Sequence, residues 1–220
     1  MSVAFFDFDK TLLSKNSGSM WLRHEMRQGR VSAWTSVRAG WWLLRYSLGS
    51  TDLEHGVREA IRAIKGQPED EMRRRVHAWY HAEVKGLYRP GGQAALSHHR
   101  AQGHKLVLLT SASNYLSEVV QQEMRLDHIL CNRFEVNAEG LYTGEPEGQV
   151  CYGQGKLHHA QSYLNSVGVA LEDCWFYTDS MADLSVMEVV GHPVAINPDP
   201  RLERVAKSRG WPVKDWGLSE

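Results

Sequence analysis

Near its first residue the sequence reads Val3-Ala4-Phe5-Phe6-Asp7-Phe8-Asp9-Lys10-Thr11-Leu12, an apolar run followed by an Asp-x-Asp-x-Thr motif. A short continuous apolar run is typical of a strand that a parallel sheet buries on both faces. Ligands of such sheets bind at the carboxyl ends of the strands. Asp7 and Asp9 would arrive there without a positive charge before Lys10, which is costly unless a cation lies between them. The stretch therefore predicts a Mg²⁺ site with a reactive aspartate; the alternative is an ordinary Asp/Thr-rich turn.

The composition is ordinary for a globular protein. The 220 residues are 42% apolar and 23% charged, with a net charge of −1, so nothing global favours nucleic acid as a partner. A chain of this length forms one domain or two small ones, as a monomer or a homodimer. The three cysteines form no CxxC pair, which argues against a disulfide framework or a zinc site. We find no signal peptide and no apolar segment of membrane-spanning length, and expect a cytoplasmic protein.

Residues 15–85 contain helical periodicity and no strand-like run. One helical stripe consists of Trp34, Val37, Trp41, Leu44 and Leu48. A capping box begins at Thr51-Asp52-Leu53-Glu54, and residues 69–85 predict a further helix. We expect an all-helical insert of three or four helices.

The charge of this insert differs from that of the remaining chain. Residues 15–85 hold 13 Lys/Arg and 8 Asp/Glu, a net charge of +5, and the remainder has a net charge of −6. A basic lid above an acidic body suits a cation in the body and an anionic substrate under the lid. Simple variation of the surface is the alternative.

After Tyr88-Arg89-Pro90-Gly91-Gly92 the sequence alternates between strand and helix patterns. The expected strands are 105–110, 128–131, 174–177 and 193–196, with a hairpin at 134–136 and 141–143. The expected helices are 93–102, 114–125, 156–167, 181–190 and about 199–209. This alternation predicts an α/β fold with a parallel sheet. Because the first strand belongs to that sheet, residues 1–14 and 86–220 form the predicted core, which the helical cap 15–85 interrupts.

Two later segments at strand ends or helix starts carry groups that could bind phosphate. Thr110-Ser111-Ala112-Ser113-Asn114 offers hydroxyl and N–H groups before a helix, where a phosphate oxygen is favoured; an ordinary capping serine is the alternative. Gly153-Gln154-Gly155-Lys156-Leu157 superficially suggests a P-loop, but Val150 and Leu157 occupy positions that the motif gives to Gly and Ser/Thr. A lysine at a helix start is not favoured by the helix dipole, which leaves room for a lysine aimed at a phosphate or an aspartate.

The predicted strand 174–177 runs into Thr178-Asp179-Ser180-Met181-Ala182-Asp183. This segment adds two carboxylates, with Asp183 one helical turn beyond Asp179. The alternative is a helix capped by Asp179 or Ser180, with Asp183 in its first turn.

Together these signals follow the order acidic pair, hydroxyl, lysine, acidic pair. In this the sequence resembles the haloacid dehalogenase (HAD) phosphatase superfamily, whose four motifs match Asp7-Phe8-Asp9-Lys10-Thr11, Ser111, Lys156 and Asp179-Ser180-Met181-Ala182-Asp183. The insert resembles the type-1 cap of its phosphoserine-phosphatase-like members, subfamily IB. The resemblance covers essentially the whole chain and implies a Rossmann-like parallel sheet with an inserted all-helical cap.

The resemblance also implies a role for each motif residue. Asp7 would be the nucleophile that forms an aspartyl-phosphate, and Asp9 the general acid and base. Mg²⁺ would be held by Asp7, the main-chain carbonyl of Asp9 and Asp179. Asp183 would orient a metal-bound water or Lys156. The groups implied beside the phosphoryl oxygens are Thr11, Ser111, Ala112 and Lys156.

The substrate implied is a small phosphorylated metabolite, but the cap departs from the phosphoserine phosphatase pattern. Asn16 stands where those enzymes place a glutamate against the substrate's amino group, and Arg58 resembles their carboxylate-binding arginine. Thr178-Asp179-Ser180 replaces their usual Gly-Asp-Gly. This resembles a branch that includes histidinol-phosphate and lipid-phosphate phosphatases.

Two alternatives stay open for the function. The cap residues Trp34, Arg38, Trp41, Trp42 and Arg45 admit a lipid substrate met at a membrane surface, although packing within the cap is favoured. A phospho-acceptor or binding module without turnover is the other alternative.

Overall fold

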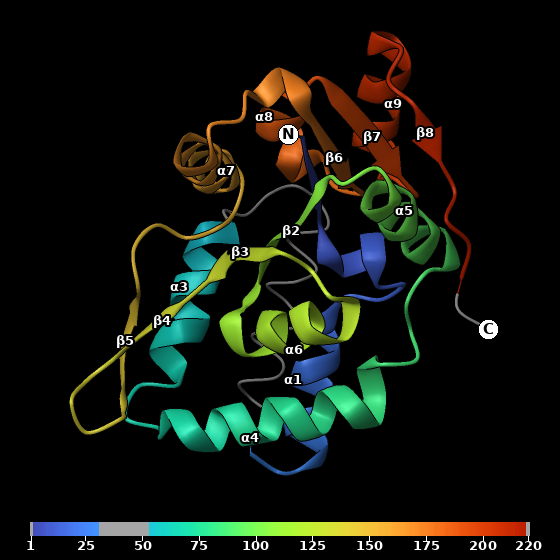
Figure 1. Cartoon of the computed structure of the whole chain (residues 1–220). Coiled ribbons are helices and arrows are strands. Elements are labelled where there is room, and N and C mark those ends of the chain that lie inside the picture. The colour runs from blue at the N-terminus through green and yellow to red at the C-terminus, as the bar shows by residue number, and fades with distance from the viewer. Residues whose placement is uncertain (1, 31–52, 219–220) are drawn as a thin grey trace.

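A computed structural model of the chain describes residues 2–30 and 53–218 (Figure 1). Its centre is a six-stranded sheet in the order β3-β2-β1-β6-β7-β8, parallel throughout. The strands are β1 (Val3–Phe6), β2 (Lys105–Ser113), β3 (His128–Asn132), β6 (Cys174–Thr178), β7 (His192–Ile196) and β8 (Val213–Lys214). The predicted parallel α/β sheet is confirmed.

Strand β1 is buried on both faces because it lies between β2 and β6. Phe6 packs on one side of the sheet and Phe5 on the other. Helices α5 (Pro90–Ala101) and α6 (Asn114–Met124) cover the Phe6 side. Helices α7 (Gln154–Val167), α8 (Leu184–Met187) and α9 (Pro200–Arg209) cover the Phe5 side. A strand covered on both faces needs the continuous apolar run from which it was predicted.

The elements that the structure describes within residues 15–85 are helical, as predicted. They are α1 (Ser17–Arg27), α3 (Leu53–Ala63), α4 (Glu69–Trp79) and a π-helical turn, Tyr80–Val84. Figure 1 shows α1, α3 and α4 in blue and teal, together at one end of the molecule. The stripe from Trp34 to Leu48 lies outside the described residues, and so do the first residues of the predicted capping box. The boundaries of the cap stay a prediction.

The predicted hairpin is present as β4 (Phe134–Val136) and β5 (Tyr142–Pro146), paired antiparallel. It contacts the connection between α3 and α4. The N–H of Gly66 donates to the carbonyl of Tyr142 at 2.8 Å, and that of Glu69 donates to Gly140 at 2.9 Å. Main-chain hydrogen bonds therefore fasten the helical cap to the core.

The structure corrects one local prediction and contains one short strand that was not predicted. The helix expected at 181–190 is a 3₁₀ turn, Met181–Asp183, followed by α8, which ends at Met187. The hydroxyl of Ser180 accepts the N–H of Ala182, and such a local bond from a side chain to the main chain competes with a regular helix. The helix expected at 69–85 is present as α4, which continues directly into the π-helical turn that ends at Val84. The edge strand β8 was not predicted, because two residues carry no recognisable alternation.

In residues 2–30 and 53–218 no helix is long and apolar enough to span a bilayer.

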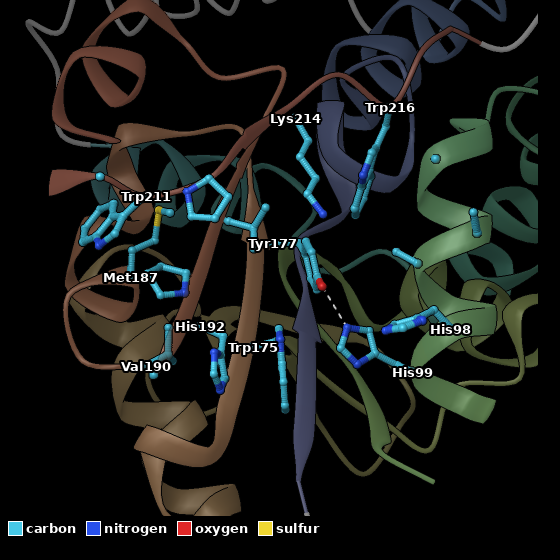
Figure 2. Close-up of a pocket in the computed structure, with 18 of the residues that line it drawn as sticks. His98, His99, Trp175, Tyr177, Met187, Val190, His192, Trp211, Lys214 and Trp216 are labelled. Carbon is cyan, nitrogen blue, oxygen red and sulfur yellow. Dashed lines mark hydrogen bonds between the residues drawn. The ribbon is translucent and has the colours of Figure 1, made fainter. Parts of the chain in front are cut away.

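The sheet face over β6 and β7 is covered only partly, beside α5 (Figure 2). A pocket of about 800 Å³ opens there, lined among others by His98, Trp175 and His192. At its floor the Nε2 atom of His99 hydrogen-bonds with the hydroxyl of Tyr177 at 2.8 Å. Burial first, and His104 second, lower the pKa of His99 to about 4. The ring is only 1% exposed, so its neutral form is part of the folded core.

We predict that His99 makes the stability of the protein depend on pH. Above its ordinary pKa of 6.5 the ring is neutral in both states; between pH 6.5 and 4 only the unfolded chain takes up the proton. The stabilisation is therefore lost as the pH falls through this window, by up to about 3 kcal/mol. In urea unfolding between pH 4 and 8, His99→Gln should flatten this acid-side slope.

The matched control is His158→Gln, since His158 lies exposed on α7. Its slope should equal that of the wild type. A His99→Gln curve parallel to the wild-type curve would contradict the assignment.

Candidate active site

The site begins where β1 ends. The chain runs outward from β1 through β2 to β3 and returns to β6 on the other side of β1. At such a switch point a crevice forms outside the carboxyl ends of the strands. Asp7 follows β1 and Asp179 follows β6, so both lie at this crevice.

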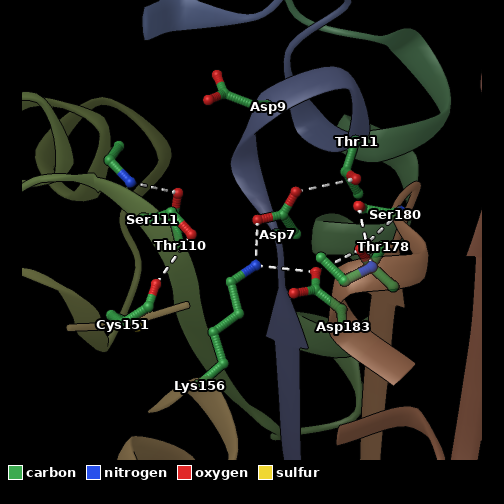
Figure 3. Close-up of polar contacts among 12 residues, drawn as sticks. Asp7, Asp9, Thr11, Thr110, Ser111, Cys151, Lys156, Thr178, Ser180 and Asp183 are labelled. Atoms are coloured by element: carbon green, nitrogen blue, oxygen red, sulfur yellow. Dashed lines mark hydrogen bonds and ion pairs between the residues drawn. The ribbon is translucent and has the colours of Figure 1, made fainter. Parts of the chain in front are cut away.

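The chain leaves β1 through a π-helical turn, Phe8–Leu12, in which Lys10 has φ +58°. The strand ends at Phe6, and this turn redirects the chain between Asp7 and Asp9. In Figure 3 the carboxylate of Asp9 lies apart from that of Asp7.

A buried ammonium joins two of the predicted acidic residues (Figure 3). The Nζ atom of Lys156 lies 2.7 Å from Asp7 Oδ1 and 2.9 Å from Asp183 Oδ2. Lys156 is 3% exposed. Burial alone would lower the pKa of Lys156, but the Asp183 and Asp7 carboxylates outweigh it and raise this pKa above its ordinary value. The lysine is therefore charged at neutral pH.

Two glycines place this lysine at the start of α7. Gly153 has φ +53° and ψ −120°, a combination that side chains disfavour. A Cβ atom on Gly155 would lie 1.9 Å from the carbonyl oxygen of Val150. The glycines that superficially suggested a P-loop thus form the turn that aims Lys156 at Asp7.

The segment after β6 is held by the hydroxyl of Thr178. This hydroxyl donates to Asp183 Oδ2 at 2.6 Å and accepts the N–H of Ser180 at 3.2 Å. The departure from Gly-Asp-Gly therefore has a structural consequence, because glycine could make neither side-chain contact.

Asp179 differs from Asp183 in lacking a donor. Its side chain is 8% exposed, and no hydrogen bond to its carboxylate is found among the described residues. Burial first, and the neighbouring Asp7 second, raise the pKa of Asp179 well above its ordinary value. Burial also raises the pKa of Asp7 to about 7, although Lys156 opposes this. The crevice is thus short of positive charge.

This donor set fits a Mg²⁺ ion. Such an ion takes one or two protein carboxylates and completes its shell with water and phosphate oxygens. Asp7 and Asp179 supply the carboxylates, and Asp179 is a buried acid without another partner in the described chain. Among the described residues no three histidine, cysteine or acidic side chains form a complete metal site, which Mg²⁺ does not require.

The carboxylate of Asp9 is bound to the first residues of the cap. The N–H of Ser17, in the first turn of α1, donates to Asp9 Oδ1 at 2.7 Å, and the side-chain amide of Asn16 reaches Asp9 Oδ2 at 3.4 Å. Asn16 Oδ1 accepts the N–H of Ser19 as the cap of α1. Burial raises the pKa of Asp9, while the bond from Ser17 opposes this. Both polar atoms of Asn16, predicted to bind substrate, are thus engaged within the protein.

Of the other predicted substrate-binding residues, Thr11 lies beside Asp7, whereas Ser111 and Ala112 bond to groups near the end of β2. The hydroxyl of Thr11 is buried and lies 3.4 Å from Asp7 Oδ2. At the end of β2 the hydroxyl of Ser111 donates to the carbonyl of Cys151 at 2.8 Å, and the N–H of Ala112 donates to the Thr110 hydroxyl at 3.1 Å. Arg58 is half-buried in α3.

Asn132, at the end of β3, was not predicted from the sequence. Its side-chain amide donates to the carbonyl of Ser111 at 2.7 Å, and its Oδ1 accepts the N–H of Cys151 at 2.8 Å. The residue is buried. The only sequence signal was a polar residue at the end of a buried strand.

Comparisons with known proteins agree with this geometry. A family model described as haloacid dehalogenase-like hydrolase matches residues 4–188. A histidinol-phosphatase of Neisseria meningitidis serogroup C (strain 8013) is 26% identical over 96% of this chain and 97% of its own. Phosphoserine phosphatase SerB1 of Mycobacterium tuberculosis (strain ATCC 25618 / H37Rv) is 28% identical over 99% of this chain and 72% of its own. A protein of unknown function from Bordetella pertussis Tohama I has a solved structure with a TM-score of 0.89, at 26% identity, over 98% of this chain and 99% of its own.

We predict that Thr178→Val destabilises the protein by about 1–3 kcal/mol, because valine keeps the shape but leaves buried polar partners unsatisfied. Chemical denaturation at pH 7 measures this loss. Thr143→Val is the control, since the Thr143 hydroxyl bonds Glu135 at an exposed position of the hairpin. Its effect should stay within about 0.5 kcal/mol; equal losses in both variants would contradict a special role for Thr178.

Proposed function

Since this chain belongs to the haloacid dehalogenase-like hydrolase family, we propose that it is a Mg²⁺-dependent phosphatase that hydrolyses a small phosphomonoester through an aspartyl-phosphate. The observation that carries the proposal is the buried Lys156 between Asp7 and Asp183, beside an Asp179 whose carboxylate has no donor in the described chain. A carboxylate that can act as nucleophile, a fixed cation and a buried carboxylate free to bind a metal thus meet at the carboxyl ends of β1 and β6. Relatives named histidinol-phosphatase and phosphoserine phosphatase support the reaction class.

In the first step a carboxylate oxygen of Asp7 attacks the phosphorus atom. The bond from phosphorus to the leaving oxygen breaks as the new bond forms. Asp9 donates its proton to the leaving alkoxide, so that the substrate alcohol departs neutral. The raised pKa of Asp9 favours a protonated carboxyl for this role.

In the second step water attacks the phosphorus of the aspartyl-phosphate. Asp9, now a carboxylate, accepts a proton from this water, and the bond between phosphorus and Asp7 breaks. Asp7 is regenerated and inorganic phosphate leaves. The proton that Asp9 gave to the alcohol is thereby replaced by one from water, and the cycle closes.

Charge compensation is the main task of the remaining residues. Lys156 holds a positive charge against Asp7, where the phosphoryl oxygens would arrive. Asp7, Asp179 and the Asp9 carbonyl would hold Mg²⁺, whose charge lets an anionic nucleophile approach an anionic phosphate. Asp183 fixes the ammonium of Lys156 from the opposite side.

The cap bears on the choice of substrate. Asn16 cannot offer a negative charge to a substrate amine, and its polar atoms already bind Asp9 and Ser19. This weakens the case for phosphoserine and leaves histidinol phosphate, the substrate class that the name of one relative indicates, as the better candidate. The cap residues on which a lipid substrate depended lie within residues 31–52, outside the described chain.

We predict that the protein hydrolyses p-nitrophenyl phosphate with Mg²⁺ and that EDTA abolishes the activity. Asp7→Asn should reduce kcat at least about 10⁴-fold, because an amide cannot form the covalent intermediate. Release of p-nitrophenol measures both effects, and Asp127→Asn, at the other end of the sheet, serves as the control.

Activity that survives EDTA or Asp7→Asn would contradict the mechanism. Release of a single equivalent of p-nitrophenol by the wild type, without further turnover, would instead identify a phospho-acceptor module.

We predict a different signature for Asp9→Asn. Alkyl phosphates need a protonated leaving group, so their hydrolysis should fall about 10²–10⁴-fold. p-Nitrophenolate leaves without a proton, so this substrate should give a burst followed by slow turnover as the aspartyl-phosphate accumulates. Rapid-quench kinetics with both substrates checks this, and equal losses without a burst would argue against acid–base catalysis by Asp9.

A panel of phosphoserine, histidinol phosphate and lysophosphatidate then tests the substrate class. Preference for histidinol phosphate in kcat/KM is the expected outcome. Preference for lysophosphatidate would favour the lipid alternative, and equal turnover of all three would show that the cap selects little.

A further inference from the structure

Asp199 lies in the short connection between β7 and α9 and is the N-terminal cap of α9. Its Oδ1 atom accepts the N–H groups of Arg201 and Leu202 at 2.8 and 3.0 Å, so it caps α9. Such a cap needs one side-chain oxygen, which serine, threonine or asparagine supplies as well as aspartate. Capping alone therefore does not require a carboxylate at this position.

The second oxygen of Asp199 reaches across to the neighbouring strand end. Oδ2 accepts the N–H of Met181 at 2.7 Å, and the main-chain N–H of Asp199 donates to the carbonyl of Asp179 at 2.8 Å. Both contacts fall on the segment between β6 and α8. Asp199 thus joins that segment to α9 with hydrogen bonds in both directions.

This link matters because the carboxylate of Asp179 has no hydrogen-bond donor of its own in the described chain. Its carboxylate receives no hydrogen bond within residues 2–30 and 53–218, although it is buried next to Asp7. No side-chain partner in that part of the chain therefore fixes its direction, and the main chain must do so. The residues that hold this main chain are Thr178 from within the segment and Asp199 from outside it.

We infer that Asp199 is a positioning residue that holds the main chain of Asp179 so that its carboxylate faces the cation site beside Asp7. The inference rests on the proposed function, in which Asp179 is a Mg²⁺ ligand. Partners that orient metal ligands typically contribute 10–100-fold to metal affinity. Asparagine could not replace Asp199 in both contacts, because its single acceptor oxygen can serve either α9 or the N–H of Met181.

The test compares two variants of Asp199 with a matched control. Asp199→Ser and Asp199→Asn each keep one acceptor oxygen, enough to cap α9, but cannot bond α9 and Met181 at the same time. Asp127→Ser is the control: Asp127 accepts the N–H of Leu106 at 2.8 Å and donates its own N–H to the Leu106 carbonyl, at the amino ends of β2 and β3. Like Asp199, it joins two segments through one side-chain and one main-chain hydrogen bond, but at the opposite end of the strands, and it also pairs with Lys105 at 2.7 Å.

Two measurements report on the full-length variants. Calorimetric titration with Mg²⁺ should show Kd raised about 10–100-fold by either Asp199 variant and changed less than about twofold by Asp127→Ser. Hydrogen exchange of the metal-free protein should show lost protection in residues 180–183 for the Asp199 variants only. Thermal unfolding confirms that each variant is folded, and Asp199→Asn serves if serine is not tolerated.

Unchanged Mg²⁺ affinity together with unchanged exchange in the Asp199 variants would overturn the inference. Equal losses of affinity in Asp127→Ser would overturn it too, since the effect would then be general destabilisation. A wild-type protein that binds no Mg²⁺ would contradict the proposed function, while exchange in the metal-free protein would still decide whether Asp199 holds the segment.

Discussion

One buried ammonium holds the centre of this molecule together. Lys156, on α7, bonds a carboxylate that follows β1 and another that follows β6, and so joins three separate stretches of chain. Removing one member of a buried ion pair typically costs 3–5 kcal/mol, because the remaining charge has no compensation. In the proposed reaction the same ammonium would also compensate the negative charge that an incoming phosphate brings to Asp7. Stability and charge compensation in the crevice therefore depend on one contact, and the glycine turn before α7 is what makes that contact possible.

Around this centre, buried polar side chains stabilise the segments that leave the strands. Main-chain groups beyond a strand end lose their ladder partners and need others when buried. Asn132 supplies them between β2 and the segment before α7, Thr178 after β6, and Asp199 between β6 and α9. Because these segments are held through their main chains, Asp179 can keep a buried carboxylate without a donor in the described chain. The segments around the site can thus stay folded although the site itself is short of positive charge.

The sequence patterns predicted those features that depend on neighbouring residues in the chain. Continuous apolar runs predicted β1 and its neighbours, and a reactive group at each strand end predicted Asp7, Ser111 and Asp179. Asn132 and Asp199 were missed because each contacts a segment that is distant in sequence, and sheet order alone brings the two together. Asp199 therefore reads as an ordinary helix cap. The π-helical turn was missed for another reason: a positive φ at a lysine leaves no mark in the pattern of side chains.

The same dependence on distant contacts joins the cap to the chemistry. Asp9 is bound by Ser17 and Asn16 at the start of α1, so the direction of its carboxyl group depends on where that helix lies. At the other end of the cap, Gly66 and Glu69 bond the hairpin of the core. A displacement of α1 that breaks the bond from Ser17 removes the strongest restraint on Asp9, whereas Asp7 and Lys156 keep theirs. In the proposed mechanism the position of the cap therefore bears more directly on proton transfer by Asp9 than on nucleophilic attack by Asp7.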